Sequence, residues 1–145
     1  SERLAATLSR LATETQDVGW DVRMVVCQQT EGAAYVQFMV DDGGIYAEIS
    51  SGRKFLPKQL RLSADALAAL RDAGWGKPSR RGGNLEEILD KADPPACASL
   101  ADKCVAGLRD VWRVPDPHSL VYRAFRSDTE ADLDLSDLGL AREEA

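Results

Sequence analysis

The chain has 145 residues, of which 44% are hydrophobic and 29% charged, a composition typical of one globular domain. No run approaches the roughly 18 apolar residues of a membrane helix, and the first residues lack the basic and apolar regions of a secretory signal. The net charge of −6 comes entirely from residues 128–145, which hold seven acids and one base. Because the remainder is formally neutral and lacks a clustered basic face, we expect neither a nucleic-acid nor a membrane partner.

Three cysteines, Cys27, Cys97 and Cys104, form no CxxC pair. On a helix, Cys97 and Cys104 would lie about 10 Å apart along the axis. A disulfide needs Cα atoms within about 7 Å, so a disulfide between Cys97 and Cys104 is excluded. We expect all three to be reduced, buried, small hydrophobic residues, as is usual in the cytoplasm.

The first third of the chain predicts one helix and three strands. Residues 2–14 place Leu4, Leu8 and Leu11 at helical spacing. Apolar and polar residues then alternate over 20–27, 34–40 and 45–49, the pattern of strands with two distinct faces. The Asp-Asp-Gly-Gly sequence at 41–44 is a strong hairpin signal. Short turns between the strands predict an antiparallel meander.

One face of this meander, with Trp20, Ala34, Val36, Phe38, Ile45, Ala47 and Ile49, is expected to lie against helices. The opposite face then carries Cys27 and the four candidate partner-binding residues, Val25, Tyr35, Met39 and Tyr46. A half-apolar face with Tyr and Met is a candidate for partner binding or for self-association. The alternative is that the connection 51–62 or the C-terminal segment covers it.

A helix is expected from Ser63, the N-cap, to about Ala73. Gly74 can adopt the left-handed conformation that ends a helix. Trp75 and Leu70 then form the hydrophobic pair of a Schellman-type stop, so that Trp75 is interpreted as a packing residue rather than a ligand-stacking one.

Residues 76–83 form a loop, and Asn84–Lys91 fits either a helical turn or a short strand. Asp93-Pro94-Pro95 begins the clearest helix. Its expected buried stripe is Cys97, Leu100, Cys104, Leu108, Val111 and Trp112. Pro115 and Pro117 end it, and residues 120–125 alternate as a last strand. We therefore expect a domain at 1–127, followed at 128–145 by an acidic, leucine-containing tail or linker.

Catalytic and metal-binding patterns are weak. The one histidine, His118, lies in a PDPHSL turn, and no nucleophile elbow or nucleotide-binding glycine loop is present. Three cysteines and one histidine lack zinc-site spacing. The acidic run that begins at Asp132 has Asp137 at the sixth position, where a calcium loop requires Gly. We expect no catalytic residue, no metal and no cofactor.

Three stretches carry a family resemblance: AAYVQFMVDDGGIYAEIS, then LSADALAALRDAGWGKP followed by Asn84, then ASLADKCVAGLRDVWRVPDPHSLVYRAF. In this order, over about residues 1 to 126, the chain resembles the type III secretion chaperone-like superfamily, in its YbjN-like or TY-Chap actinobacterial branch. The signature residues of the resemblance are Leu70, Gly74, Trp75, Pro78, Asn84 and Trp112.

This resemblance implies an α+β fold in which helices pack on one face of a curved antiparallel sheet, in the order α-β-β-β-α-(β)-α-β. It also implies a homodimer that binds extended segments of partner proteins without ATP. The leading interpretation is a non-enzymatic, cytoplasmic protein-binding module that also self-associates. The alternative is a regulatory or structural domain of a larger protein with no chaperone activity of its own.

Overall fold

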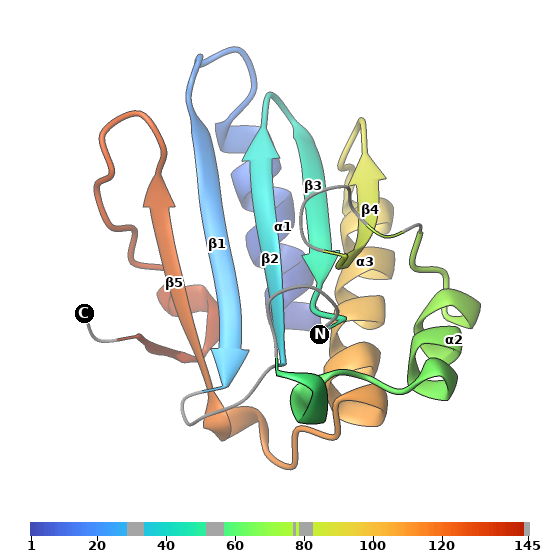
Figure 1. Ribbon diagram of the computed structural model, residues 1–145. Helices are drawn as coiled ribbons and strands as arrows, with labels where there is room; N and C mark the ends of the chain where they lie inside the picture. Colours follow the sequence, from blue (N-terminus) through green and yellow to red (C-terminus); the bar gives the residue numbers. More distant parts are fainter. Residues whose placement is uncertain (29–33, 52–56, 77, 79–82, 144–145) are drawn as a thin grey trace.

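The computed structural model describes residues 1–28, 34–51, 57–76, 78 and 83–143 (Figure 1). Within them the helices and strands run in the order α1 (Glu2–Glu14), β1 (Asp21–Gln28), β2 (Tyr35–Asp41), β3 (Gly44–Ile49), α2 (Ala64–Asp72), β4 (Leu85–Leu89), α3 (Pro94–Ala106), β5 (Leu120–Arg126) and β6 (Ala141–Arg142). The strands form one sheet in the order β4-β3-β2-β1-β5-β6. All neighbours are antiparallel except β5 and β6.

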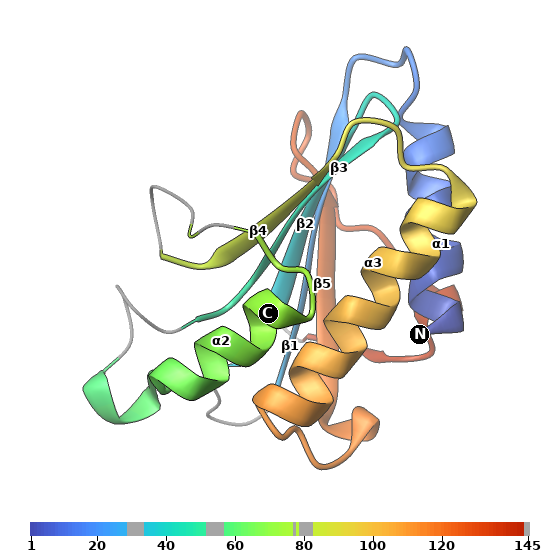
Figure 2. The same cartoon turned by 90° about the vertical axis from the view of Figure 1, so that its right-hand side faces the viewer.

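Two layers make up the molecule. Helices α1 and α3 lie side by side against one face of the curved sheet (Figure 2). Helix α2 lies near the C-terminal end of α3, where its Leu70 side chain approaches Gly107. The predicted α+β class, with helices packed on one face of an antiparallel sheet, is therefore confirmed.

The core follows from alternation along the strands. Met24, Phe38 and Ala47 stand in register on three adjacent strands, and all three are buried. On the helix side, Leu8 and Leu100 fill the space opposite them. Trp20 is only partly buried, and the Arg126 guanidinium lies 4.3 Å from the centre of its ring. The predicted inward face of the first three strands is thus confirmed, with Trp20 at its edge.

The end of α2 has the predicted stop. Gly74 adopts a φ of +108°. The Trp75 amide donates to the Leu70 carbonyl at 3.1 Å and the Gly74 amide to the Arg71 carbonyl at 3.0 Å, which is the Schellman pattern. Trp75 is 3% exposed and Leu70 fully buried, so the interpretation of Trp75 as a packing residue is confirmed.

The segment after Asn84 is a strand. Residues Leu85–Leu89 pair antiparallel with β3, from Ile49 opposite Leu85 to Ile45 opposite Leu89. The outer edge of β4 is partly occupied, because the Gly76 amide donates to the Glu86 carbonyl at 2.9 Å and Pro78 forms a bridge with Leu85. Pairing with β3 therefore decides for the short strand over the helical turn that the sequence also allowed.

Helix α3 begins as predicted, with the Asp93 carboxylate accepting from the Ala96 amide at 2.9 Å. It continues beyond Ala106 in a π-helical turn, Gly107–Val111. A Cβ on Gly107 would lie 2.5 Å from the Ile49 side chain, so glycine permits the close approach of helix to sheet here. The predicted stripe is buried as far as Leu108, whereas Val111 and Trp112 are only partly buried.

The acidic segment packs on the body. Leu135 and Leu138 belong to the core, at 2% and 6% exposed, and the Leu133 amide donates to the Ala124 carbonyl of β5 at 2.9 Å. The Asp137 carboxylate accepts two hydrogen bonds from Arg10 of α1 at 3.0 Å. A domain boundary at residue 127 stays a prediction, but side chains from both sides of it share one core.

Candidate functional site

The face of the sheet opposite α1 and α3 is the first candidate site, and we call it the open face. Strand register arranges most of its side chains in two rows across the strands, and Cys27 pairs with Tyr35 beyond them. One row runs Ile88, Tyr46, Met39, Arg23, Phe125, and the next runs Glu86, Glu48, Gln37, Val25, Arg123. In the described part of the chain no helix lies over these rows (Figure 2). Ile88 is accordingly 60% exposed.

All four sequence-predicted binding residues lie on this face. Val25, Tyr35, Met39 and Tyr46 occupy the adjacent strands β1, β2 and β3, and Met39 pairs directly with Tyr46. Each is half-buried by its neighbours. The structure therefore brings the four together on one face of the sheet.

A polar network lies beside these apolar residues, with Glu48 at its centre. Glu48 is 8% exposed. One carboxylate oxygen accepts from the Gln37 amide at 2.5 Å and from the Asn84 amide at 3.3 Å, and the other accepts from the Tyr46 hydroxyl at 2.7 Å. These donors hold a carboxylate in a partly desolvated position, which would be costly without them.

The hydrogen bonds of the Asn84 side chain explain why an asparagine precedes β4. Its amide nitrogen also donates to the Tyr35 hydroxyl at 2.7 Å, and its oxygen accepts from the Ser51 backbone amide at 3.2 Å. It thus joins the start of β4 to the end of β3 and to the open face. Trp112 fixes the neighbouring residue, since its indole donates to the Ser50 carbonyl at 2.8 Å.

Two carboxylates compete for one hydroxyl in this network. Glu48 and Glu86 are directly opposite in the register, and both contact the Tyr46 hydroxyl. Burial, followed by its hydrogen bonds to Glu86 and Glu48, raises the pKa of Tyr46 well above its usual range. A hydroxyl carries one proton and donates to one carboxylate at a time. Among the described residues Glu48 also has Gln37 and Asn84 as donors, whereas the side chain of Glu86 has only the Tyr46 hydroxyl.

Charge is divided across the open face. The glutamates lie on β3 and β4, whereas Arg23 and Arg123 lie on β1 and β5. No salt bridge joins the two sides among the described residues, and Arg23 pairs instead with Asp21 on its own strand at 3.2 Å.

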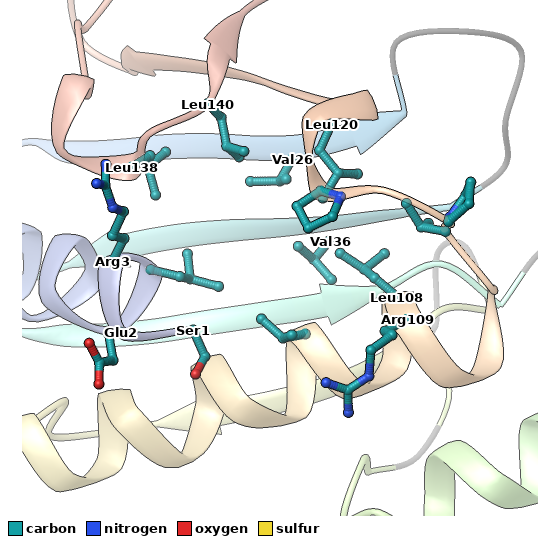
Figure 3. A pocket seen from close by; sticks show the side chains of 15 residues that line it. Ser1, Glu2, Arg3, Val26, Val36, Leu108, Arg109, Leu120, Leu138 and Leu140 are labelled. Carbon is teal, nitrogen blue, oxygen red and sulfur yellow. The ribbon is translucent and has the colours of Figure 1, made fainter.

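A cavity of about 610 Å³ lies on the other side of the sheet, between the first turn of α1 and the end of α3. Figure 3 shows Val26 and Val36 of the sheet, Leu108, Leu120, Leu138 and Leu140 around it. Arg3 lies along one wall beside Leu138, whereas Arg109 points away from the apolar group and pairs with Asp110 at 2.8 Å. The lining is mainly apolar.

The three cysteines are free. Cys97 and Cys104 are fully buried, and Cys27 is half-buried on the open face. Burial raises the pKa of all three thiols, with a smaller contribution from Glu143 at Cys27 and from Asp93 at Cys97. They are therefore protonated at neutral pH, which makes them poor nucleophiles.

Other candidate chemistry is sparse in the described ranges. His118 lies exposed in the turn Pro117–Ser119, where its backbone amide bonds to Asp116. Among these residues no three His, Cys, Asp or Glu side chains gather in a group that could hold a metal ion.

Sequence reasoning missed part of the open face. Ile88, Glu86, Arg123 and Phe125 were not assigned to it, although alternation along 85–89 and 120–126 was the signal that could have placed them. The cavity had no such signal. Its walls come from six separate stretches of chain, and only folding brings them together.

The described helices include none with the length and apolar character needed to cross a membrane. Comparison with known proteins found no matching curated protein and no matching solved structure. One family matches, described as T3SS (YopN, CesT) and YbjN peptide-binding chaperone 3, over residues 1–126. The matched range spans α1 to β5 and so includes the open face. Assignment to an actinobacterial branch stays a prediction, but the chain belongs to the TY-Chap3 family of peptide-binding chaperones.

Proposed function

We propose that this protein binds an extended segment of a partner polypeptide on the open face of its sheet, without catalysis and without a cofactor. The observation that carries the proposal is the open face itself. Half-exposed apolar side chains adjoin Glu48 and Glu86, which compete for the single proton of the Tyr46 hydroxyl. The family description, a peptide-binding chaperone, supports the same class of ligand.

The partner segment should carry a basic residue between apolar ones. Glu86 competes with the better-supplied Glu48 for the single proton of Tyr46, so an arginine or lysine of the segment would supply Glu86 with donors. Met39 and Ile88 lie in the adjoining row and offer apolar contact on the same side. Alternate side chains of an extended peptide point to one side, which suits rows spaced along the strands.

The same face is complementary to itself, and we propose that two copies associate through it when no partner is bound. A two-fold axis along β2 would set Arg123 of one copy opposite Glu86 of the second, and Phe125 opposite Ile88. In such an isologous contact each pair occurs twice. We also propose a cytoplasmic location, which the free cysteines support.

The test uses peptides selected on the immobilised protein from a random nine-residue display library. The peptides are resynthesised with a fluorophore and measured by fluorescence anisotropy. We expect selected sequences to place Arg or Lys between apolar residues. Exchanging that cation for Glu should weaken binding at least about tenfold, because like charges then face each other.

Variants locate the site. Glu86→Gln should weaken the cationic peptide but not its Gln-substituted version, and Met39→Gln or Ile88→Ser should weaken both. Val18→Ser is the matched control, since Val18 is 44% exposed and lies before β1, outside the open face. Peptides that bind the three open-face variants as tightly as the wild type would place the site elsewhere and overturn the proposal.

A further inference from the structure

The cavity between α1, α3 and the sheet has no role in the peptide proposal, because it lies on the opposite side of the sheet. Its volume of about 610 Å³ falls within the roughly 300–1,000 Å³ of small-molecule sites. Val26 and Val36 are 4% and 1% exposed and form its floor.

The walls are also formed by residues that are only partly buried. Val105 of α3 lies on one side, and Leu140 of the C-terminal segment lies on another. These side chains line a space without closing it, so a ligand can enter between them. Pro115 and Pro117 add further apolar surface without backbone donors.

Three charged side chains of the lining, Glu2, Arg3 and Arg109, distinguish this space from a plain apolar gap. Arg3 lines the cavity, and no hydrogen bond or ion pair joins it to any described residue. Its guanidinium lies against Gly139, where a Cβ would clash with it. The second arginine of the lining, Arg109, is already paired with Asp110. A guanidinium at an apolar cavity complements a ligand with an apolar chain and a carboxylate.

We propose that this cavity binds a linear monocarboxylate of fatty-acid type, with the hydrocarbon chain between the sheet and the two helices and the carboxylate at Arg3. Chain burial supplies most of the affinity and the arginine selects the anionic end. The site is independent of the open face, so a peptide selected there and a bound carboxylate should not compete.

Isothermal titration calorimetry with octanoate, decanoate and decan-1-ol tests the proposal on the full chain. Each added methylene should tighten binding about fourfold while the cavity has room. Arg3→Gln should weaken decanoate about fivefold, the range of a solvent-accessible ion pair, and leave decan-1-ol unchanged. Arg71→Gln, on the exposed side of α2, is the control and should change neither.

Filling the cavity gives the second measurement. Val105→Phe should weaken decanoate and decan-1-ol at least tenfold, and Val18→Phe, the same exchange outside the cavity, should weaken neither. Circular dichroism checks that each variant is folded, and Leu140→Phe replaces Val105→Phe if the latter is not. Absence of decanoate binding, equal binding to the filled variants, or an unchanged affinity in Arg3→Gln would each overturn the proposal.

Discussion

Trp75 and Asn84 show how single side chains hold this fold. Neither lies inside a helix or strand, yet Trp75 is 3% exposed and Asn84 is 7% exposed. Trp75 closes the end of α2 against Leu70, with the Lys103 ammonium 5.5 Å from its ring centre. Asn84 joins β4, the end of β3 and Tyr35 through three hydrogen bonds. Loop position therefore says little about their contribution to stability.

Trp75→Ala should lower the free energy of unfolding by about 3 kcal/mol, because a buried aromatic side chain leaves a cavity. Urea denaturation followed by circular dichroism measures the loss. Trp75→Phe, which keeps most of the apolar surface, should cost clearly less. Coinciding urea midpoints for wild type and Trp75→Ala would show that Trp75 is not a packing residue.

The thiols provide a second test at this scale. Cys97 and Cys104 are fully buried, so native labelling with a thiol reagent should be slow at both and faster at half-buried Cys27. Denaturation should then expose three reactive thiols.

A pH effect on stability follows from the same thiols. Burial raises the pKa of Cys104 above the value near 9.0 expected in the unfolded chain. The folded state therefore keeps its proton where the unfolded state loses it, and this contribution is complete below about pH 9 and lost above it. Relative to Cys104→Ala, wild-type stability should fall more steeply above pH 9. Equal slopes would contradict the assignment.

At the scale of elements, the C-terminal segment is part of the body. Leu135 and Leu138 lie in the core, and Asp137 is held by Arg10 and Thr7 of α1. Its backbone also follows the outer side of β5, with the Glu143 amide donating to the Tyr122 carbonyl at 2.7 Å. The segment that supplies the whole net charge thus also covers an edge of the sheet, which limits edge-to-edge pairing.

Leu135→Ala and Leu138→Ala should each destabilise the protein by about 3 kcal/mol, as deletions of buried leucine side chains do. Leu60→Ala is the control, since Leu60 is 45% exposed and should cost little. Asp137→Asn should cost under about 1 kcal/mol, because its ion pair with Arg10 is solvent-accessible. If both leucine variants match wild type in urea, the segment does not contribute to the core in solution.

For the whole molecule, the division of charge across the open face predicts an isologous dimer. Light scattering should give a mass above that of one chain at high protein concentration. Ile88→Glu, which sets a carboxylate beside Glu86 on an exposed position, should shift the equilibrium to monomer while circular dichroism stays unchanged. The apolar part of the contact is not screened, so 1 M salt should weaken the dimer without abolishing it.

A wild type that is monomeric at every concentration would remove the dimer proposal. Peptide binding on the open face would be unaffected by that result, since a monomer leaves the face free. Val18→Glu, a new carboxylate outside the face, controls for the added charge.

Local sequence patterns determined most of the elements of this protein. Alternation fixed the strands at 21–28, 35–41 and 44–49, and positive φ at Asp42 and Gly43 forms the turn that Asp-Asp-Gly-Gly predicted. Capping chemistry fixed the ends of α2. Each of these features depends on residues only a few positions apart, so the sequence alone is enough to predict them.

Tertiary contacts decided the rest. Residues 85–89 fit two local conformations equally, and pairing with β3 chose the strand, because cross-strand hydrogen bonds outweigh a weak local preference. The same pairing put Glu86 beside Glu48 and Ile88 beside Tyr46, which no spacing along the chain reveals. The cavity and the burial of Leu135 and Leu138 likewise depend on surfaces from distant segments meeting. The hydrophobic effect is non-directional and does not depend on separation along the sequence, so the neighbours of these side chains are decided only when the sheet and helices pack.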